Sequence, residues 1–293
     1  MPTATRKRPL KIVTAELLKE FPWLLHGFST RAAGFSRAYG GTTLNLGFTR
    51  HDSRRAVERN RAQFQRQIGA VEGSRPWPLI TLRQVHSDLI HCIDSPPEHQ
   101  LTGDGLITAS PEILLAIQTA DCLPLILVDP ENRAVGVFHA GWRGTVKRIA
   151  EKGVGEMQRC FGTRSRRIKA AIGPGIHGCC YQVGAEVREK FESQFAYAAD
   201  LFHELKESDA VREKYPLLFL TGRPPGHGKL PAKIFLDLVE ANRRQLVDAG
   251  VAARNIEASS LCTACRPDLL FSHRAEKGIT GRMMGVVGIR TKQ

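Results

Sequence analysis

The sequence lacks long apolar runs. No stretch approaches the roughly 20 consecutive apolar residues that span a bilayer, and the N-terminus lacks the apolar core of a secretory signal peptide. Seven cysteines, an odd number in 293 residues, do not indicate a disulfide framework. We therefore expect a cytoplasmic protein without membrane contact, in which cysteine acts as a thiol, a metal ligand or a nucleophile.

Internal repeats, low-complexity tracts and aromatic-rich basic stretches are also missing. The lack of aromatic-rich basic stretches disfavours a surface on which the bases of single-stranded nucleic acid stack. Lys plus Arg exceed Asp plus Glu by 42 to 29, which favours small anionic partners such as phosphate or nucleotides, although a plain basic surface explains the excess equally well. Part of it lies in a basic tail, residues 1–12, which we expect to be frayed. Residues 13–293 are predicted to form one catalytic domain, and we expect a monomer.

Apolar runs alternate along the chain with segments of helical spacing. The pattern predicts strands at 80–86, 105–108, 114–118, 123–129, 134–140 and 168–175. It predicts helices at 54–69, 145–161, 184–196 and 231–250. Several strand-like runs are apolar throughout, which is typical of a sheet covered on both faces. We therefore predict an α/β fold (α+β in some schemes), a single-domain layered sandwich with a mixed, helix-covered β-sheet.

Three residues stand at the ends of strand-like runs: His86 in "RQVHSD", Cys122 in "TADCLP" and His139 in "FHAGWRG". If the two runs between Cys122 and His139 pair, both residues finish at the same edge of a sheet. Two imidazoles and one thiolate form a three-ligand zinc set, and a fourth position open to water makes such a zinc catalytic. Asp121 is a candidate to orient a histidine or to accept a proton.

Two other interpretations of these residues stay open. Cys122 is also a candidate thiolate nucleophile, with His139 as its base and Asp121 as the orienting group. A histidine taken alone is more often a hydrogen-bonded structural residue. Residue types and spacing do not separate these possibilities.

The segment "HAGWRGT" leads from a predicted strand into the helix expected from Thr145. Its glycines allow a tight loop, and a helix N-terminus favours anions. Arg143 offers a planar donor fork suited to phosphate or carboxylate. The alternative is an ordinary turn with a surface arginine.

Four further cysteines occur as two pairs. Cys179 and Cys180 are adjacent, which favours buried thiols in a tight loop. Cys262 and Cys265 form "CTAC", a candidate half of a structural zinc site or a redox pair. No second C-x-x-C completes a four-cysteine site.

A set of motifs in fixed order resembles the YfiH-like family, also labelled the multicopper polyphenol oxidase or laccase-domain family. The resemblance covers about residues 26–290. Its most specific part is the pair "TADCLP" and "HAGWRGT". The remaining motifs are "HGFSTRAAGFS", "TTLNLGF", "VERNRAQF", "RQVHSD", "GDGLIT", "AAIGPGIHGCCYQVG", "LCTAC" and "FSHRAEKGITGRMM". One departure is Ser272-His273-Arg274-Ala275, where the family often has "SYRR".

The resemblance implies an α/β sandwich and a metal site made by His86, Cys122 and His139. It implies phosphorolysis of adenosine, inosine, guanosine and methylthioadenosine, and deamination of adenosine. The family is also described as copper-dependent polyphenol oxidases (laccases) and as peptidoglycan-precursor editing enzymes. A cysteine amidohydrolase is a further alternative.

The donor count ranks these activities. Multicopper oxidases hold several coppers with many closely spaced histidines, including H-x-H pairs, whereas this chain has ten histidines and no H-x-H pair. One zinc, with copper as the alternative ion, suits deamination by activated water. Phosphorolysis needs a phosphate site, for which Arg143 and Arg31 are candidates. Asn45 and Gln84 are candidates to hydrogen-bond the sugar or base. The predicted partners are therefore purine nucleosides and inorganic phosphate.

Overall fold

The computed structural model describes residues 11–205 and 232–291. The chain forms two compact units, one made of the residues up to Ile176 together with those from Leu238 onward, and the other of His177–Asp237. The basic tail predicted over residues 1–12 lies almost entirely outside the described residues. The single catalytic domain over 13–293 stays a prediction. Among the described helices, none is long and apolar enough to cross a membrane.

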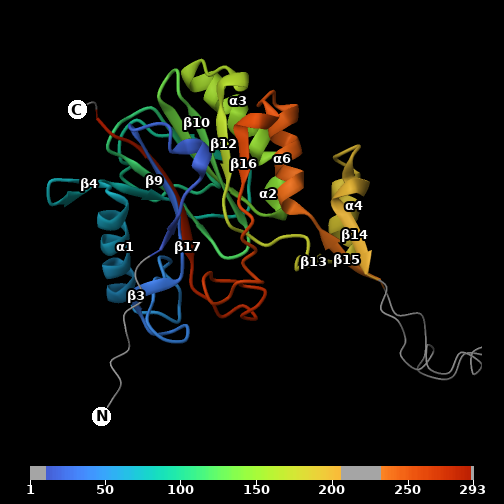
Figure 1. Ribbon diagram of the computed structural model, residues 1–293, viewed down its shortest axis with the longest axis horizontal. Coiled ribbons are helices and arrows are strands. Elements are labelled where there is room, and N and C mark those ends of the chain that lie inside the picture. The colour runs from blue at the N-terminus through green and yellow to red at the C-terminus, as the bar shows by residue number, and fades with distance from the viewer. Residues whose placement is uncertain (1–10, 206–231, 292–293) are drawn as a thin grey trace, which may run out of the picture. The chain divides into compact units, whose positions relative to one another are not determined.

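Two mixed sheets form the core of the first unit (Figure 1). The five-stranded sheet has the order β1 (Ile12–Val13), β2 (Leu24–Ser29), β17 (Met283–Ile289), β9 (Leu114–Thr119) and β6 (Leu79–Thr81). The six-stranded sheet has the order β16 (Ile256–Ala258), β12 (Lys169–Ile172), β10 (Leu123–Asp129), β11 (Ala134–Ala140), β8 (Gly105–Thr108) and β7 (Ile90–Cys92). The predicted fold class is confirmed, with two packed sheets in place of one.

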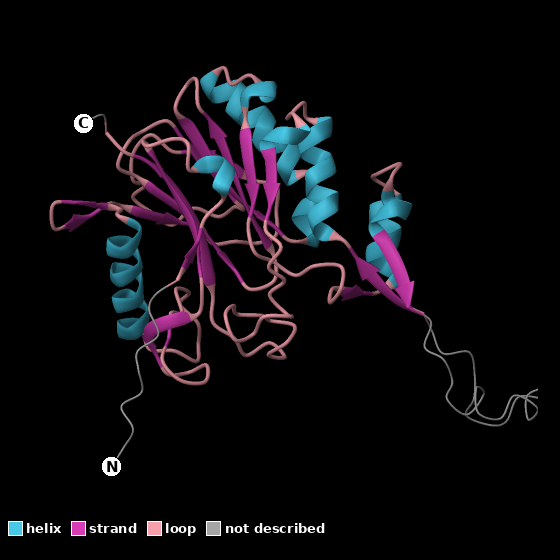
Figure 2. Cartoon of the chain, in the orientation of Figure 1, coloured by secondary structure: helices cyan, strands magenta, loops and turns pink. Residues whose placement is uncertain are grey.

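Helices cover the outer faces of the two sheets (Figure 2). Helix α1 (Arg54–Ile68) packs on β2 and β3 (Ala32–Ser36), and α3 (Ile149–Phe161) packs on β10 and β11. Side chains of a strand alternate between faces, so β17 contributes side chains to two hydrophobic clusters. Met284 and Val286 join the apolar cluster that contains Phe64 of α1, while Val287 and Ile289 join the cluster between the sheets.

The helices differ from the prediction in three places. The segment predicted as one helix over 145–161 forms α2 (Trp142–Val146) and α3, because Arg148 between them has a left-handed backbone with φ of 65°. The segment predicted as helical from 231 forms β15 (Lys233–Leu236) before α6 (Leu238–Asp248), because β15 pairs with two strands distant in sequence. The third predicted helix is shorter, α4 (Ala185–Glu192).

Helix α1 confirms its predicted limits for a local reason. The Ser53 side chain accepts a hydrogen bond from the Ala56 backbone N–H at the N-terminus, and Gly69 ends the helix in a left-handed conformation with φ of 81°. Both are common capping arrangements.

The second unit contains a small antiparallel sheet in which β15 lies between β13 (Gln182–Val183) and β14 (Phe202–Leu205). The His203 and Phe235 rings stack across it, with centroids 5.1 Å apart. Only one further short element of the described chain, η3 (Ala198–Leu201), belongs to this unit. The short elements of the first unit are β4 (Val71–Glu72), β5 (Arg75–Pro76), η1 (Glu16–Leu18), η2 (Ser165–Arg167) and η5 (Ala253–Asn255).

Candidate metal centre

His86, Cys122 and His139 converge in the first unit. The potential ligand atoms of the three side chains all lie within 4.8 Å of one another. The Cys122 Sγ is 3.9 Å from the His86 Nε2, and the two imidazole centroids are 4.9 Å apart at 67°. Three residues that are 36 and 17 positions apart along the chain therefore form one cluster.

The register of two strands brings Cys122 and His139 together. Strands β10 and β11 are antiparallel neighbours, with Leu123 opposite Ala140 and Pro124 opposite His139. Cys122 directly precedes β10, so it lies at the edge where β11 ends. This is the placement that the paired apolar runs predict.

His86 reaches the same edge from the loop that follows β6. Its backbone has φ of 56°, in the left-handed region that few non-glycine residues adopt. The Lys147 Nζ lies 3.5 Å from the His86 carbonyl oxygen and donates to it. A strained backbone at a ligand position is one of the features that mark functional sites.

The cluster shifts the pKa values of its members in opposite directions. Burial alone would raise the pKa of the Cys122 thiol, but His139 and His86 beside it lower this pKa to about 6. Burial alone would lower the pKa of His139, but the Cys122 thiolate and Asp104 raise it to about 9. The metal-free pair is therefore a thiolate beside an imidazolium at neutral pH.

Asp104 is the carboxylate that contacts the cluster. It is fully buried, and its Oδ1 lies 2.7 Å from the His139 Nδ1. Burial would raise the pKa of Asp104, but hydrogen bonds from His139 and Ser87 hold it well below its usual value. Sequence reasoning missed this residue, although it stands directly before a predicted strand.

Asp121 points to a different set of partners. Its Oδ1 accepts hydrogen bonds from the hydroxyls of Thr263 and Ser272, and its Oδ2 accepts one from the Arg274 backbone N–H. Its φ is 95°. The histidine-orienting contact that the sequence assigned to Asp121 is made by Asp104, while Asp121 ties the segment before β10 to two points of the connection between β16 and β17.

Gly141 lies against the cluster. A Cβ atom at this position would stand 2.9 Å from the Cys122 Sγ and 3.0 Å from the His86 Cδ2. Any larger residue would push into the space that the three ligands share. The glycine of "HAGW" is therefore a requirement of the site, whereas its φ of −79° and ψ of 171° suit any residue.

Arg143 is exposed two residues after Gly141. Its guanidinium carbon lies 4.4 Å from the centroid of the Trp142 ring. Within the described chain its side chain makes no hydrogen bond or ion pair, so its donors face solvent. Its role as a donor fork for phosphate or carboxylate stays a prediction.

The three other predicted substrate contacts are occupied within the protein. Arg31 donates to the carbonyl oxygens of Pro267 and Tyr39, and it pairs with Glu276 at 3.1 Å. Asn45 is fully buried, and its amide bonds Gly47, Asp52 and Arg282. Gln84 exchanges two hydrogen bonds with the Gln118 backbone. These three side chains hold loops and strands together.

The donor set fits a metal ion. One thiolate and two imidazoles within 4.8 Å match the ligand types and spacing of a zinc site with a fourth position open, and they also suit copper. The Asp104 contact leaves the His139 Nε2 for the metal and fixes the ring, as carboxylates do for many metal-bound histidines.

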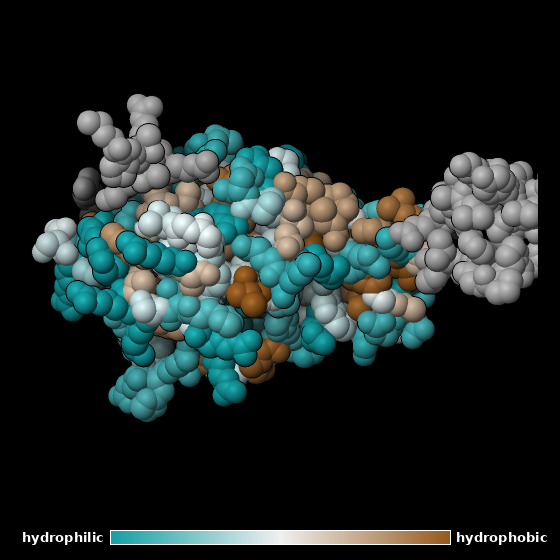
Figure 3. All heavy atoms as spheres, turned by 90° about the horizontal axis from the view of Figure 1, so that it is seen from below, coloured by the Kyte–Doolittle hydropathy of each residue, from teal (hydrophilic) through white to brown (hydrophobic). Residues whose placement is uncertain are grey.

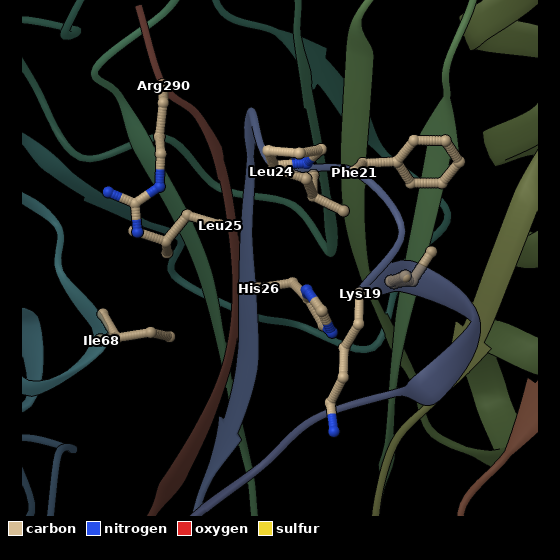
Figure 4. A pocket seen from close by; sticks show the side chains of 9 residues that line it. Lys19, Phe21, Leu24, Leu25, His26, Ile68 and Arg290 are labelled. Atoms are coloured by element: carbon tan, nitrogen blue, oxygen red, sulfur yellow. The ribbon is translucent and has the colours of Figure 1, made fainter.

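Other surface features lie apart from these residues. A cavity of about 280 Å³ beside β2 is lined by apolar side chains together with His26, Lys19 and Arg290 (Figure 4). None of its lining residues belongs to the cluster. On the face drawn in Figure 3, hydrophilic residues predominate and hydrophobic ones gather in small groups.

The fold and the site together define an α/β protein in which two histidines and a cysteine form a candidate metal centre. The family model for the multi-copper polyphenol oxidoreductase laccases matches residues 25–290. The chain belongs to this family, as the resemblance of its motifs predicts.

Three relatives show the range of the family. A purine nucleoside phosphorylase of Deinococcus radiodurans is 36% identical over 269 residues, covering 92% of this chain and 90% of that protein. The adenosine deaminase RL5 of an unknown prokaryotic organism is 38% identical over 205 residues, covering 67% and 69%. The crystal structure of the hypothetical protein YfiH of Bacillus licheniformis superposes with a TM-score of 0.78 at 32% identity, covering 93% and 95%.

Proposed function

We propose that this chain is a zinc-dependent purine nucleoside enzyme. It would phosphorolyse adenosine, inosine, guanosine and methylthioadenosine and deaminate adenosine. The observation that carries the proposal is the convergence of His86, Cys122 and His139 at one edge of the six-stranded sheet. The names of the relatives, a purine nucleoside phosphorylase and an adenosine deaminase, support the substrate class.

His86, Cys122 and His139 would hold the metal, and Asp104 would keep the His139 ring oriented. When bound, a divalent metal supplies Lewis acidity for activating water or a substrate oxygen. Gly141 keeps the approach to the ligands open because it has no side chain. The buried Asp104–His139 pair holds a proton on the Nδ1 and directs the Nε2 into the cluster.

Arg143 would bind the phosphate. In phosphorolysis a phosphate oxygen forms a bond to the sugar C1′ while the C1′–N9 bond breaks and the purine leaves with the electron pair and takes up a proton. The exposed guanidinium, two residues after Gly141 in the sequence, offers two parallel donors to such an anion. The role of Arg31, Asn45 and Gln84 would be to hold the surrounding structure in place, since their polar atoms hydrogen-bond neighbouring loops and strands.

A cysteine amidohydrolase is the second candidate. Cys122 lies beside His139, and His139 hydrogen-bonds Asp104, which is the order of nucleophile, base and orienting carboxylate. Thiol alkylation would then abolish turnover, whereas removal of the metal would not. Copper-dependent oxidation of polyphenols is the third candidate, supported by the family description.

The decisive experiment combines metal analysis of the purified protein with product profiling on adenosine and phosphate. We expect bound zinc, with adenine plus ribose 1-phosphate and inosine as products, all lost on chelation and restored by zinc. Turnover that persists without metal but stops on alkylation would replace the proposal with the amidohydrolase. No nucleoside product from the zinc-loaded protein would refute it.

Arg143→Ala tests the phosphate site. We expect the KM for phosphate to rise at least about tenfold, because a charge-assisted hydrogen bond is worth about 1.5–3 kcal/mol, while adenosine deamination changes little. Arg55→Ala is the matched control, because Arg55 is an exposed arginine of α1. Equal KM values for the two variants would remove Arg143 from the phosphate site.

A further inference from the structure

Asp104 accepts hydrogen bonds from both segments that carry the histidines. Its Oδ1 receives the His139 Nδ1 at 2.7 Å and the His86 backbone N–H at 3.1 Å. Its Oδ2 receives the backbone N–H groups of Val85 at 3.2 Å and Ser87 at 2.6 Å, and the Ser87 hydroxyl at 2.7 Å. One buried carboxylate therefore satisfies five donors.

The three successive N–H groups explain the conformation of the His86 segment. A non-glycine residue at φ of 56° is strained, and such a backbone persists only where surrounding contacts fix it. Successive N–H groups that converge on one anion form a nest. Here the anion is the side chain of Asp104, so the turn that presents His86 depends on a carboxylate that stands directly before β8.

The backbone of Asp104 is fixed by the six-stranded sheet. Its N–H donates to the Leu89 carbonyl oxygen, and its own carbonyl oxygen accepts the His139 N–H at 2.7 Å. The next residue, Gly105, pairs with Phe138 of β11. The carboxylate thus stands on a rigid strand end between the two histidines.

We propose that Asp104 is the positioning residue that pre-arranges both histidines for metal binding, by fixing the His139 ring and by holding the left-handed turn at His86. This inference rests on the metal site of the proposed function. It does not depend on which reaction the site performs.

Asp104→Asn separates this role from simple filling of space. The amide has nearly the same shape but only one acceptor oxygen, so it loses either the bonds that Oδ1 accepts from His139 and His86 or those that Oδ2 accepts from Val85 and Ser87. We expect zinc affinity to fall about 10–100-fold, the usual cost of losing such a partner. Ser87→Ala is the matched control, because it removes one of the five donors and leaves the three backbone N–H groups in place. Its zinc affinity should stay within about threefold.

The assay is competition with a chromophoric zinc chelator, alongside circular dichroism to show that each variant is folded. Zinc affinity of Asp104→Asn equal to that of Ser87→Ala would overturn the proposal. A second measurement needs no variant. In the zinc-loaded wild-type protein, nitrogen-15 NMR should show a proton on the His139 Nδ1 that exchanges slowly with solvent, and a proton on the Nε2 instead would also overturn it. Tight zinc binding without nucleoside turnover would refute the proposed reaction and leave this inference standing.

Discussion

Replacing Gly141 with alanine should weaken metal binding without disturbing the fold. The backbone at this position, with φ of −79° and ψ of 171°, is ordinary extended conformation that alanine adopts freely. The added Cβ would stand 2.9 Å from the Cys122 Sγ and 3.0 Å from the His86 Cδ2, whereas ordinary contacts lie at 3.4–4 Å. The whole effect of the substitution therefore falls on two of the three ligands.

The size of the effect follows from these distances. The ligands must retreat by about 0.4–0.5 Å to restore ordinary contact, and metal–ligand distances tolerate only about 0.2 Å. We expect zinc affinity to fall about 10–100-fold, as for other losses of ligand alignment. This corresponds to about 1.4–2.7 kcal/mol.

Zinc titration against a competing chelator measures this loss, and urea unfolding of the metal-free protein measures stability. Gly155→Ala is the matched control. Gly155 lies within α3 with no atom near its missing Cβ, so alanine there should stabilise the helix by about 0.5–1 kcal/mol and leave zinc affinity unchanged. If Gly141→Ala binds zinc as tightly as the wild type, the glycine is not needed by the ligands and the argument from the site geometry fails.

The thiol and the core give two further predictions. In the metal-free protein, iodoacetamide should modify Cys122 with a half-maximal rate near pH 6, because His139 and His86 hold its pKa there, and one equivalent of zinc should protect it. A rate that rises only above pH 8 would contradict the thiolate–imidazolium pair. Phe64→Ala removes a fully buried side chain from the cluster beneath α1, so the free energy of unfolding should drop by about 3–5 kcal/mol with zinc stoichiometry unchanged. Urea unfolding and metal analysis check this, and a loss below 1 kcal/mol would show that the core beneath α1 is not closely packed.

The placement of Cys122 and His139 at one sheet edge could be predicted because it depends on neighbouring segments. Strands β10 and β11 are apolar runs joined by a short turn, in which Asp129 accepts hydrogen bonds from the backbone of Glu131 and Asn132. All seven residues of each strand are paired. The local sequence pattern was sufficient to predict this pairing, because the turn residues fix the register of the two strands.

Strands β2 and β17 could not be predicted in the same way, although they are central in the five-stranded sheet. They pair with each other from opposite ends of the chain, and glycines interrupt their apolar pattern. Close packing leaves no room for a side chain at these glycines. A Cβ on Gly27 would stand 2.6 Å from Ile12, and one on Gly285 would stand 2.7 Å from Pro124. Each glycine is therefore required by a packed neighbour that lies elsewhere in the sequence.

The two aspartates show why the support of the site was harder to predict than its ligands. Asp121 adjoins Cys122 in sequence, yet its carboxylate bonds Thr263 and Ser272. Asp104 is 35 residues from His139, yet it meets the ring because β8 and β11 are neighbours. Ligand identity follows from residue chemistry, whereas the choice of hydrogen-bond partner depends on strand order.

The geometry also bears on the laccase description of the family. A multicopper centre requires several clusters of histidines. Among the described residues, the only group of three or more potential metal ligands that includes a histidine is His86, Cys122 and His139. His26 bonds the Ala15 backbone, and His91 bonds the Thr102 carbonyl oxygen. The described chain therefore offers a histidine-containing site for one ion. A single ion with one thiolate and two imidazoles suits polar activation of a substrate, so this donor set fits the proposed hydrolytic and phosphorolytic chemistry better than a multicopper centre.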